Sequence, residues 1–327
     1  MLFPVRRPRR LRIDGRLRNM VKQFTVEPRQ LIYPLFVAEN IKKPDEISSM
    51  PGQMHWPVSM IDKPVKEAMK KGVTAFLLFG IPSHKDPHGD SGCSDNSVIC
   101  KAIKQLKKKC PEAYIITDVC LCEYTSHGHC GFLDKEGNVE NDVSCAQLAK
   151  MALAHVKAGA DMVAPSDMMD GRIAAIRELL DDNGFTNTPI MSYSVKYASS
   201  FYGPFREAAD SAPGKGDRKG YQMDFSNSRD ASIELECDYE EGADILMVKP
   251  GLPYLDILKT AKDMYDCPLC SYHVSGEYSM IKAAAQKGWI DEKKVVLESL
   301  TAMRRAGADL IITYYAPEAA EWLKENK

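Results

Sequence analysis

Ala158-Gly159-Ala160-Asp161 precedes the short apolar run 162–164 (MVA), and this order of residues recurs along the chain. The other copies are 241–244 (EGAD) before 245–248 (ILMV), 306–309 (AGAD) before 310–312 (LII), and a weaker 71–74 (KGVT) before 75–79 (AFLLF). Apolar residues have helical spacing before each copy. A glycine just past a helix end adopts a left-handed conformation at little cost, and a short apolar run is typical of a strand buried on both faces. Each copy therefore predicts a helix, a glycine turn and a parallel strand.

The same pattern extends over the whole chain and predicts eight strands separated by helices. Parallel strands need a helical crossover, so strict alternation of strand and helix predicts a parallel sheet. Eight units that close on themselves make a TIM (β/α)8 barrel, which usually takes about 250 residues. An open doubly wound sheet is the alternative, but no G-x-G-x-x-G motif follows the first predicted strand. The predicted strands are 31–37, 74–79, 113–119, 161–165, 189–194, 244–248, 269–274 and 309–314.

The composition is that of a soluble globular protein, with 44% hydrophobic and 27% charged residues among 327. The chain has 43 Lys and Arg residues and 45 Asp and Glu residues, which gives a net charge of −2. It therefore lacks the excess of basic residues that is typical of proteins that bind nucleic acid. No apolar run approaches the roughly 20 residues of a membrane span. Ten cysteines, mostly scattered, occur without a secretory signal pattern. This combination predicts reduced thiols and a cytoplasmic protein that binds neither nucleic acid nor membrane.

Seven arginines lie within the first 18 residues, where only Asp14 opposes them. A solvated arm is the plainest interpretation, and an arm that docks on a sister subunit is the alternative. No linker divides the rest of the chain. We therefore expect an N-terminal arm over residues 1–30, making subunit contacts, and a single TIM-barrel domain over residues 31–327.

Reactive residue types gather where the predicted strands end, which is where TIM barrels place their functional groups. A random soluble barrel would show fewer such coincidences, so this rim is the expected site. The residues are Asp118, Cys120 and Cys122 after the third strand, Ser166 and Asp167 after the fourth, Lys196 after the fifth, Lys249 after the sixth, Ser275 and Glu277 after the seventh, and Tyr314 at the end of the eighth.

Lys196 and Lys249 each follow a buried apolar strand. Burial favours the neutral amine, and two neighbouring ammonium groups lower each other's pKa. A neutral lysine attacks carbonyl carbons and forms a Schiff base. A salt-bridged or snorkelling side chain is the simpler interpretation of either lysine alone. Two lysines on neighbouring strands instead predict two carbonyl substrates, or one carbonyl substrate and one tuning charge.

The loop 120–130 (CLCEYTSHGHC) carries three thiols, Cys120, Cys122 and Cys130, and two imidazoles, His127 and His129. Thiolate and imidazole ligands suit Zn²⁺, and three protein ligands leave a fourth position for water or substrate. Either histidine would close that position in a structural site. The alternative is a loop that is rich in cysteine but binds no metal. The place of this loop after the third strand favours a catalytic zinc.

Two further loops have both a plain and a functional interpretation. The segment 201–222 is glycine-rich and basic. It is either a solvated loop or a lid that brings Arg206 and Arg218 onto a substrate carboxylate. Asp86, His88 and Asp90 have the oxygen-rich composition of a hard-metal loop, although a hydrated surface loop is the plainer interpretation.

With these residues together, the sequence resembles the porphobilinogen synthase (5-aminolevulinate dehydratase) family over nearly its whole length. The resemblance implies a TIM-barrel hydro-lyase that condenses two 5-aminolevulinate molecules to porphobilinogen, with loss of two waters, in tetrapyrrole (haem or chlorophyll) biosynthesis. It also implies a homo-octamer built from dimers, with the arm wrapped around a neighbour. The motifs that carry it are DVCLCEYTSHGHCG (118–131), APSDMMDGR (164–172), KYASSFYGPFR (196–206), MVKPG (247–251) and YHVSGE (272–277).

The resemblance also implies roles for single residues. Lys249 and Lys196 would form Schiff bases with the substrates at the P site and the A site, beside Asp118. Ser275 and Tyr314 would hold the P-site carboxylate. The remaining roles fall on Arg206, Arg218 and Gln222 for the A-site carboxylate, Cys120, Cys122 and Cys130 for catalytic Zn²⁺, and Glu234 for an allosteric Mg²⁺ unless it is simply a solvated helix residue.

The mechanism expected from this resemblance uses both imines as electron sinks. Deprotonation next to one imine gives the enamine that forms the carbon–carbon bond, and imine exchange closes the ring. Zinc would act as a Lewis acid near the A-site substrate, and either Asp118 or a group at zinc would take the last proton. Two alternatives are a class I aldolase-type lyase, which needs neither the cysteines nor a second lysine, and a non-catalytic zinc-binding assembly protein.

Overall fold

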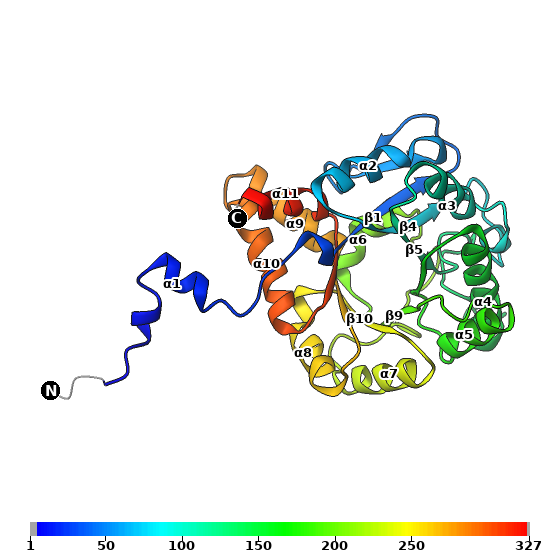
Figure 1. Ribbon diagram of the computed structural model, residues 1–327. Helices are drawn as coiled ribbons and strands as arrows, with labels where there is room; N and C mark the ends of the chain where they lie inside the picture. Colours follow the sequence, from blue (N-terminus) through cyan, green and yellow to red (C-terminus); the bar gives the residue numbers. More distant parts are fainter. Residues whose placement is uncertain (1–4, 326–327) are drawn as a thin grey trace.

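The computed structural model describes residues 5–325, and within them eight parallel strands form a ring surrounded by helices (Figure 1). The order around the ring is β8-β5-β4-β1-β12-β11-β10-β9. β8 and β9 meet at a parallel bridge from Val163 to Ile190, next to the hydrogen bond that the Val163 amide donates to the Pro189 carbonyl (3.2 Å). The TIM-barrel prediction is confirmed, and the open sheet is excluded. The strands are β1 (Leu31–Ala38), β4 (Ala75–Ile81), β5 (Tyr114–Val119), β8 (Met162–Pro165), β9 (Met191–Lys196), β10 (Ile245–Lys249), β11 (Leu269–His273) and β12 (Leu310–Thr313).

Helices follow the strands and bury their apolar faces against them. In α3 the residues Ile99, Ile103 and Leu106 are buried at the predicted helical spacing, and the Ser97 hydroxyl caps the helix by accepting a hydrogen bond from the Cys100 amide (3.1 Å). The helices are α1 (Gly15–Met20), α2 (Asp62–Lys71), α3 (Val98–Lys109), α4 (Asn141–Ala158), α5 (Arg172–Asp182), α6 (Gly203–Ala208), α7 (Arg229–Glu240), α8 (Leu255–Met264), α9 (Ser275–Gln286), α10 (Glu292–Ala306) and α11 (Ala316–Glu325).

Four short strands within the described residues lie outside the ring of eight. β3 (Met54–Pro57) pairs with β1 and with β2 (Asp45–Glu46), and β6 (Phe132–Leu133) forms a small hairpin with β7 (Val139–Glu140). This hairpin begins directly after the cysteine loop 120–130 and leads into α4.

The glycine of each repeated phrase ends a helix in a conformation that L-residues rarely adopt. After Gly159 reverses the chain, its amide donates to the Val156 carbonyl (2.9 Å) and the Ala160 amide donates to the His155 carbonyl (3.1 Å), which satisfies the last carbonyls of α4. The φ angles are +99° at Gly72, +109° at Gly159, +99° at Gly242 and +132° at Gly307.

The aspartate of the phrase ties each strand to its neighbour at the strand's beginning. A carboxylate oxygen of Asp161 accepts from the Ile115 amide (2.6 Å), and the Asp161 amide donates to the Ile115 carbonyl (2.9 Å). Asp244 makes the same two bonds with Ile190 (2.8 and 2.9 Å), and Asp309 makes them with Leu269 (3.1 and 2.7 Å). The repeat therefore specifies the register of neighbouring strands as well as the helix ends.

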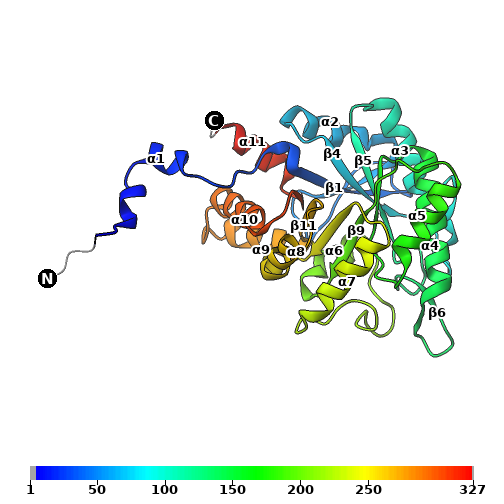
Figure 2. The same ribbon diagram turned by 60° about the horizontal axis from the view of Figure 1, so that its bottom comes forward.

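The part of the arm around α1 lies away from the barrel in two views (Figures 1 and 2), whereas the residues just before β1 pack against the barrel and bury Val26. The apolar side chains of the part around α1, Val5, Leu11, Ile13 and Met20, are exposed in this chain. Residues 1–4 and 326–327 of the expected arm and barrel lie outside the described residues, and the subunit role of the arm stays a prediction. None of the helices within residues 5–325 has both the length and the apolar character that crossing a membrane requires.

Candidate active site

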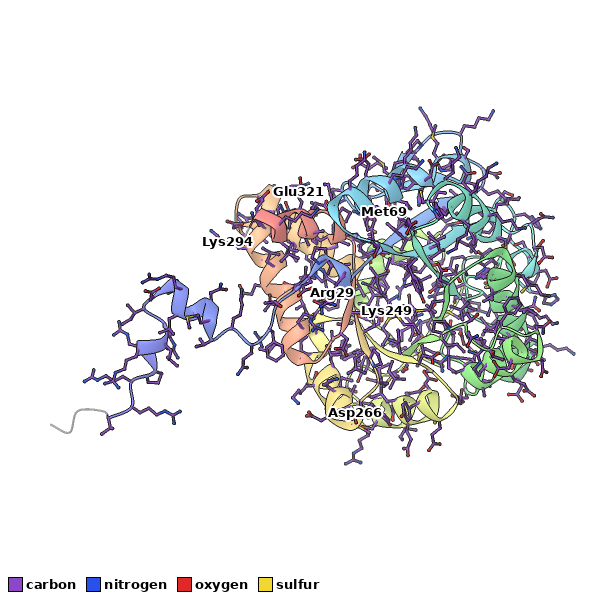
Figure 3. All side chains as sticks on the ribbon, in the orientation of Figure 1. Arg29, Met69, Lys249, Asp266, Lys294 and Glu321 are labelled. Carbon is purple, nitrogen blue, oxygen red and sulfur yellow. The ribbon has the colours of Figure 1, made fainter. Side chains whose placement is uncertain are left out.

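The barrel places Lys196 and Lys249 side by side. They are the last residues of β9 and β10, and the two strands pair them directly. Neighbouring strands lie about 4.8 Å apart, and side chains at paired positions leave the sheet on the same face. Both lysines are 4% exposed, and Lys249 lies inside the ring of strands (Figure 3). The predicted strands 189–194 and 244–248 end two residues and one residue before these lysines, because the sequence does not show that strand pairing continues through them.

Aromatic rings surround the Lys249 ammonium. Its Nζ atom lies 4.5 Å from the ring centre of Tyr272, 5.0 Å from those of Tyr193 and Phe205, and 5.1 Å from that of Tyr202. Burial, and then the positive charge of Lys196, lower the pKa of Lys249 to about 7. A pKa near 7 leaves a large neutral fraction of this amine at neutral pH, which is the form that attacks a carbonyl carbon.

Lys196 has a different environment. Its ammonium donates a hydrogen bond to the Ser166 carbonyl and lies 5.6 Å from the ring centre of Tyr193. Burial acts to lower the pKa of Lys196, but the negative charge of the Cys130 thiolate, and then that of Cys120, raises it overall. The prediction that both lysines would have lowered pKa values is thus wrong for Lys196, because it considered only the two ammonium groups and omitted the neighbouring thiolates.

The three cysteines of the loop converge on one point. Cys120, Cys122 and Cys130 are buried free thiols, and their sulfurs lie within 4.8 Å of one another, with 3.3 Å between those of Cys120 and Cys122. Zinc–sulfur bonds of about 2.3 Å in a tetrahedron separate the sulfurs by just under 4 Å, so this donor set fits one such ion.

Neither histidine of the loop completes the cysteine cluster. One nitrogen of His129 contacts the Tyr221 hydroxyl (3.1 Å) and the other contacts the Lys215 carbonyl (2.9 Å). In His127, Nε2 contacts the Pro87 carbonyl (3.1 Å) and Nδ1 accepts from the His129 amide (3.1 Å). All four ring nitrogens are engaged in other contacts, so neither histidine joins the three sulfurs that the described residues bring together.

Asp118 stands beside the lysines with one oxygen free. Its Oδ2 accepts a hydrogen bond from the Ser166 hydroxyl (3.1 Å), while Oδ1 has no partner among the described residues. Burial, and then the charge of Glu123, raise the pKa of Asp118 to about 7. Glu123 is a second buried carboxylate here, and burial raises its pKa as well. Glu123 stands within the cysteine motif, but no feature of the neighbouring sequence indicates its burial or a role for it.

Ser275 and Tyr314 border the cage around Lys249. Ser275 begins α9, and its hydroxyl accepts a hydrogen bond from the Phe205 amide (3.0 Å). The ring of Phe205 is one of those that surround the Lys249 ammonium. Tyr314 follows β12, and its hydroxyl lies 3.1 Å from that of Tyr272. Each of the two residues therefore contacts one of the aromatic residues of the cage.

Arg206, Arg218 and Gln222 come together in the segment 201–222. Arg218 is buried and donates to the carbonyls of Gly128 (2.9 Å) and Ser211 (2.5 Å). Burial, and then the charge of Arg218, lower the pKa of the half-buried Arg206. Nε of each arginine and both amide atoms of Gln222 have no hydrogen-bond partner among the described residues. Unpartnered donors on two neighbouring cations suit a bound carboxylate.

The same segment closes over the cysteine loop. The Gly214 amide donates to the His127 carbonyl (3.0 Å), and the His129 ring contacts Lys215 and Tyr221. This arrangement has the form of a lid in contact with its base.

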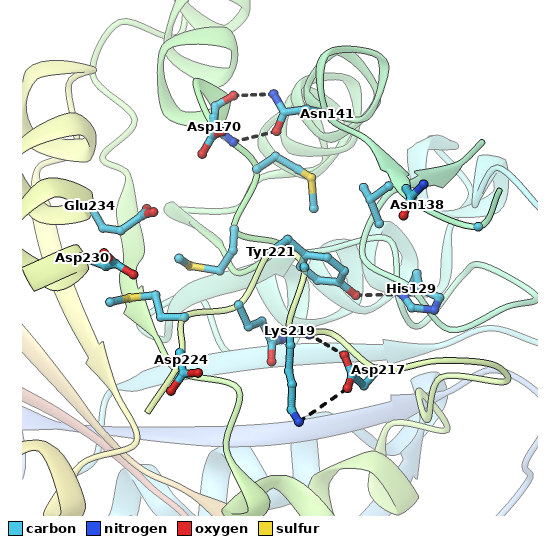
Figure 4. Close-up of a pocket in the computed structure, with 17 residues that line it drawn as sticks. His129, Asn138, Asn141, Asp170, Asp217, Lys219, Tyr221, Asp224, Asp230 and Glu234 are labelled. Atoms are coloured by element: carbon cyan, nitrogen blue, oxygen red, sulfur yellow. Dashed lines mark hydrogen bonds and ion pairs between the residues drawn. The ribbon is translucent and has the colours of Figure 1, made fainter. Parts of the chain in front are cut away.

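Glu234 lies on α7 and lines a cavity of about 660 Å³ (Figure 4). Burial, together with the charges of Asp238 and Asp170, raises its pKa to about 7. A hard cation that keeps most of its waters needs only one or two carboxylates, so this lining is compatible with Mg²⁺. Other acidic residues of the lining are Asp170, Asp217, Asp224 and Asp230.

The loop with Asp86, His88 and Asp90 brings three ligand atoms within 4.8 Å of one another. The Asp86 carboxylate already accepts hydrogen bonds from the amides of His88 (2.8 Å) and Asp90 (3.1 Å). These bonds explain the shape of the loop without a metal.

Sequence reasoning missed the rings of Tyr193, Tyr202, Phe205 and Tyr272. They come from three separate segments, and aromatic residues within apolar runs look like ordinary core. A signal was present only in the motifs 196–206 and 272–277, which contain three of the four.

Two paired lysines at the rim of a TIM barrel, beside a thiolate cluster and under an arginine-bearing lid, define a barrel enzyme for a carboxylated carbonyl substrate. The family model for delta-aminolevulinic acid dehydratase matches residues 5–322, and the chain belongs to this family. The family resemblance and the hydro-lyase class predicted from the motifs are confirmed.

Relatives match the chain over nearly its whole length. The delta-aminolevulinic acid dehydratase of Archaeoglobus fulgidus is 54% identical over 322 residues, covering 98% of this chain and 99% of that protein. The Bacillus subtilis enzyme of the same name is 52% identical over 319 residues, covering 98% of each. The crystal structure of the Toxoplasma gondii enzyme (porphobilinogen synthase) with its reaction product porphobilinogen has a TM-score of 0.96 and 49% identity, covering 98% of this chain and 92% of that one.

Proposed function

We propose that this chain condenses two 5-aminolevulinate molecules to porphobilinogen, with release of two waters, through one imine on each of Lys249 and Lys196. The observation that carries the proposal is the direct pairing of two buried lysines at the ends of β9 and β10. An aldolase-type lyase needs one such lysine, and a non-catalytic assembly protein needs none.

Lys249 is the first nucleophile of this scheme. A pKa of about 7 leaves a large neutral fraction at neutral pH, and the amine nitrogen attacks the ketone carbon of the P-site substrate, from which the oxygen leaves as water. The surrounding rings exclude bulk water from the imine. Ser275 and Tyr314 hold the substrate carboxylate at the edge of this cage.

Lys196 binds the A-site substrate in the same way after losing a proton. Asp118 has a free oxygen beside both lysines and a pKa of about 7, so it can hold a proton or release one during the reaction. The A-site carboxylate takes the unpartnered atoms of Arg206, Arg218 and Gln222.

Cys120, Cys122 and Cys130 would hold a catalytic Zn²⁺ with an open fourth side. When bound, this ion supplies a Lewis acid next to the A site. Glu234 would bind an activating Mg²⁺ from the cavity on α7. The arm, with its exposed Val5, Leu11 and Ile13, would pack on a neighbouring subunit of a homo-octamer built from dimers.

Borohydride reduction in the presence of 5-aminolevulinate tests the proposed function. Imine formation releases one water and hydride reduction then gives a stable secondary amine, so peptides containing Lys249 and Lys196 should each gain the substrate mass less one oxygen atom. Untreated protein should form porphobilinogen. The adducts are identified by peptide mass spectrometry, with pyruvate as a control keto acid. Absence of an adduct on both lysines would overturn the two-imine scheme.

The reactivity of the Lys249 amine should depend on pH with a midpoint near 7. The protonated amine is not nucleophilic, so its reaction with a small acylating reagent should rise about tenfold per pH unit below the pKa and level off above it. In Lys196→Met the loss of a neighbouring positive charge should move this midpoint upward. Peptide mass spectrometry after timed labelling gives the profile. A midpoint near 10 in the wild type would contradict the environment described for Lys249.

A further inference from the structure

We propose that Arg172, held by Asp238, is a positioning residue for Lys196, because it fixes the loop 166–169 whose Ser166 carbonyl holds the Lys196 ammonium. The inference deepens the proposed function and rests on it in taking Lys196 as the A-site nucleophile.

Arg172 and Asp238 form an ion pair inside the protein. Both residues are 1% exposed, and the guanidinium binds both oxygens of the carboxylate, from NH1 to Oδ1 at 2.8 Å and from NH2 to Oδ2 at 3.0 Å. Removing two charges from water is expensive, and apolar residues of similar size often stabilise a fold equally well. The stability of the fold therefore does not explain why this ion pair is present. The rigid guanidinium can instead fix the relative positions of the groups that it binds.

The same two nitrogens of Arg172 also contact two other elements. NH1 donates to the Met169 carbonyl (3.2 Å), in the loop after β8. NH2 donates to the Ser192 hydroxyl (3.2 Å) and to the Tyr193 carbonyl (3.4 Å), both on β9, the strand that ends at Lys196. One side chain thus connects α7, this loop and β9.

The loop 166–169 needs support from outside. Met168 has a φ of +74°, a left-handed conformation that is unfavourable for a residue with a side chain of this size. Within the loop, the Asp167 carboxylate accepts from the Met169 amide (2.8 Å). Arg172 adds the bond to the Met169 carbonyl and a contact with the Met168 sulfur (3.9 Å).

Ser166 connects this loop to the chemistry. Its carbonyl accepts the hydrogen bond of the Lys196 ammonium, and its hydroxyl donates to Asp118 (3.1 Å). A displaced loop would therefore move the Lys196 amine and one side of Asp118 together.

Lys249 is linked to Arg172 less directly, through Tyr193, whose carbonyl contacts Arg172 and whose ring lies 5.0 Å from the Lys249 ammonium. Its ammonium lies among aromatic rings, of which Tyr202, Phe205 and Tyr272 belong to other segments. Loss of the Arg172 fork should therefore affect Lys196 more strongly than Lys249, an asymmetry that a general loss of stability would not produce.

The test uses the double variant Arg172→Met/Asp238→Leu in the full-length holoenzyme, because an apolar pair replaces both partners of the bidentate contact. The buried Asp167 carboxylate, whose Oδ1 lies 3.8 Å from Arg172 Nε, loses this cation in the variant, and burial should keep it protonated. Both lysines are labelled with a small acylating reagent in the absence of substrate, and turnover is measured separately. Freed from the Ser166 carbonyl, Lys196 should label on the order of tenfold faster, while Lys249 stays within about twofold of wild type. The kcat should fall about 10- to 100-fold, the scale of a misplaced reacting group.

Arg177→Met is the matched control. This arginine lies on the same helix, where it binds the carbonyls of Phe185 (2.9 Å) and Thr188 (2.7 Å), and its loss should leave both labelling rates and turnover unchanged. If the double variant does not fold, Arg172→Lys serves instead, since one ammonium cannot reach Asp238 and both other elements together.

Unchanged Lys196 labelling, unchanged kcat, or equal changes at both lysines in a folded variant would each overturn the positioning role. Failure of the proposed function is distinguishable from these results. It would show as wild-type protein without substrate adducts, whereas the labelling comparison needs no substrate at all.

Discussion

Product formation should fall on the order of 10⁵-fold or more in a Lys249→Met variant, which is the scale of losing a covalent nucleophile. Methionine has about the same length and packs well against aromatic rings, so the cage of Tyr272 and its neighbours should remain filled. The measurement is steady-state porphobilinogen formation together with borohydride trapping. No adduct should appear on the peptide containing residue 249.

Two comparisons make this result specific. Lys262→Met removes a half-exposed lysine on α8, the helix that follows the same strand, and should leave turnover unchanged. Lys196→Met should prevent product formation but still allow an adduct on Lys249, since the P-site amine is intact. A Lys249→Met enzyme that kept more than about a hundredth of wild-type activity would remove covalent catalysis at this position.

Loss of the cysteine cluster should have the second largest effect. Removal of bound metal with a chelator, or the substitution Cys120→Ala, should lower kcat by at least about 10²-fold, the upper range for changes in groups that merely support metal ligands. Zinc added back should restore the chelated wild type but not the variant. Elemental analysis of the purified protein should show metal in the wild type and its loss from Cys120→Ala.

The matched control for this result is Cys237→Ala, since Cys237 is an exposed thiol on α7, outside the cluster. It should keep both metal and activity. Full turnover of metal-free wild type, or undiminished metal in Cys120→Ala, would contradict a catalytic role for an ion on these sulfurs.

Local sequence patterns predict much of the fold. The phrase around Gly159 has its meaning within a dozen residues, because a helix end requires a residue that tolerates positive φ and a strand buried on both faces requires continuous apolar residues. The neighbouring sequence does not predict that Asp161 ties its strand to the next one. Its partner, the amide of Ile115, lies 46 residues away in the sequence.

The residues of the site likewise fall into those that local sequence predicts and those that depend on distant contacts. Cys120, Cys122 and Cys130 were recognisable because a metal-binding loop is local and its ligand types are specific. His127 and His129 could not be excluded from that set until their ring nitrogens were seen to bind Pro87, Tyr221 and other groups from outside the loop.

By itself, the sequence determined the alternation of helices and strands, the reactive residues at strand ends, the cysteine trio and, through its motifs, the family. Each of these depends on short-range backbone conformation, on burial or on residue identity. The tertiary structure alone decided that Lys196 pairs with Lys249, that aromatic rings enclose Lys249, that thiolate charge raises the pKa of Lys196, and that Arg172 is buried against Asp238. Electrostatic and packing effects depend on distances in space, and those exist only after the barrel has brought distant segments together.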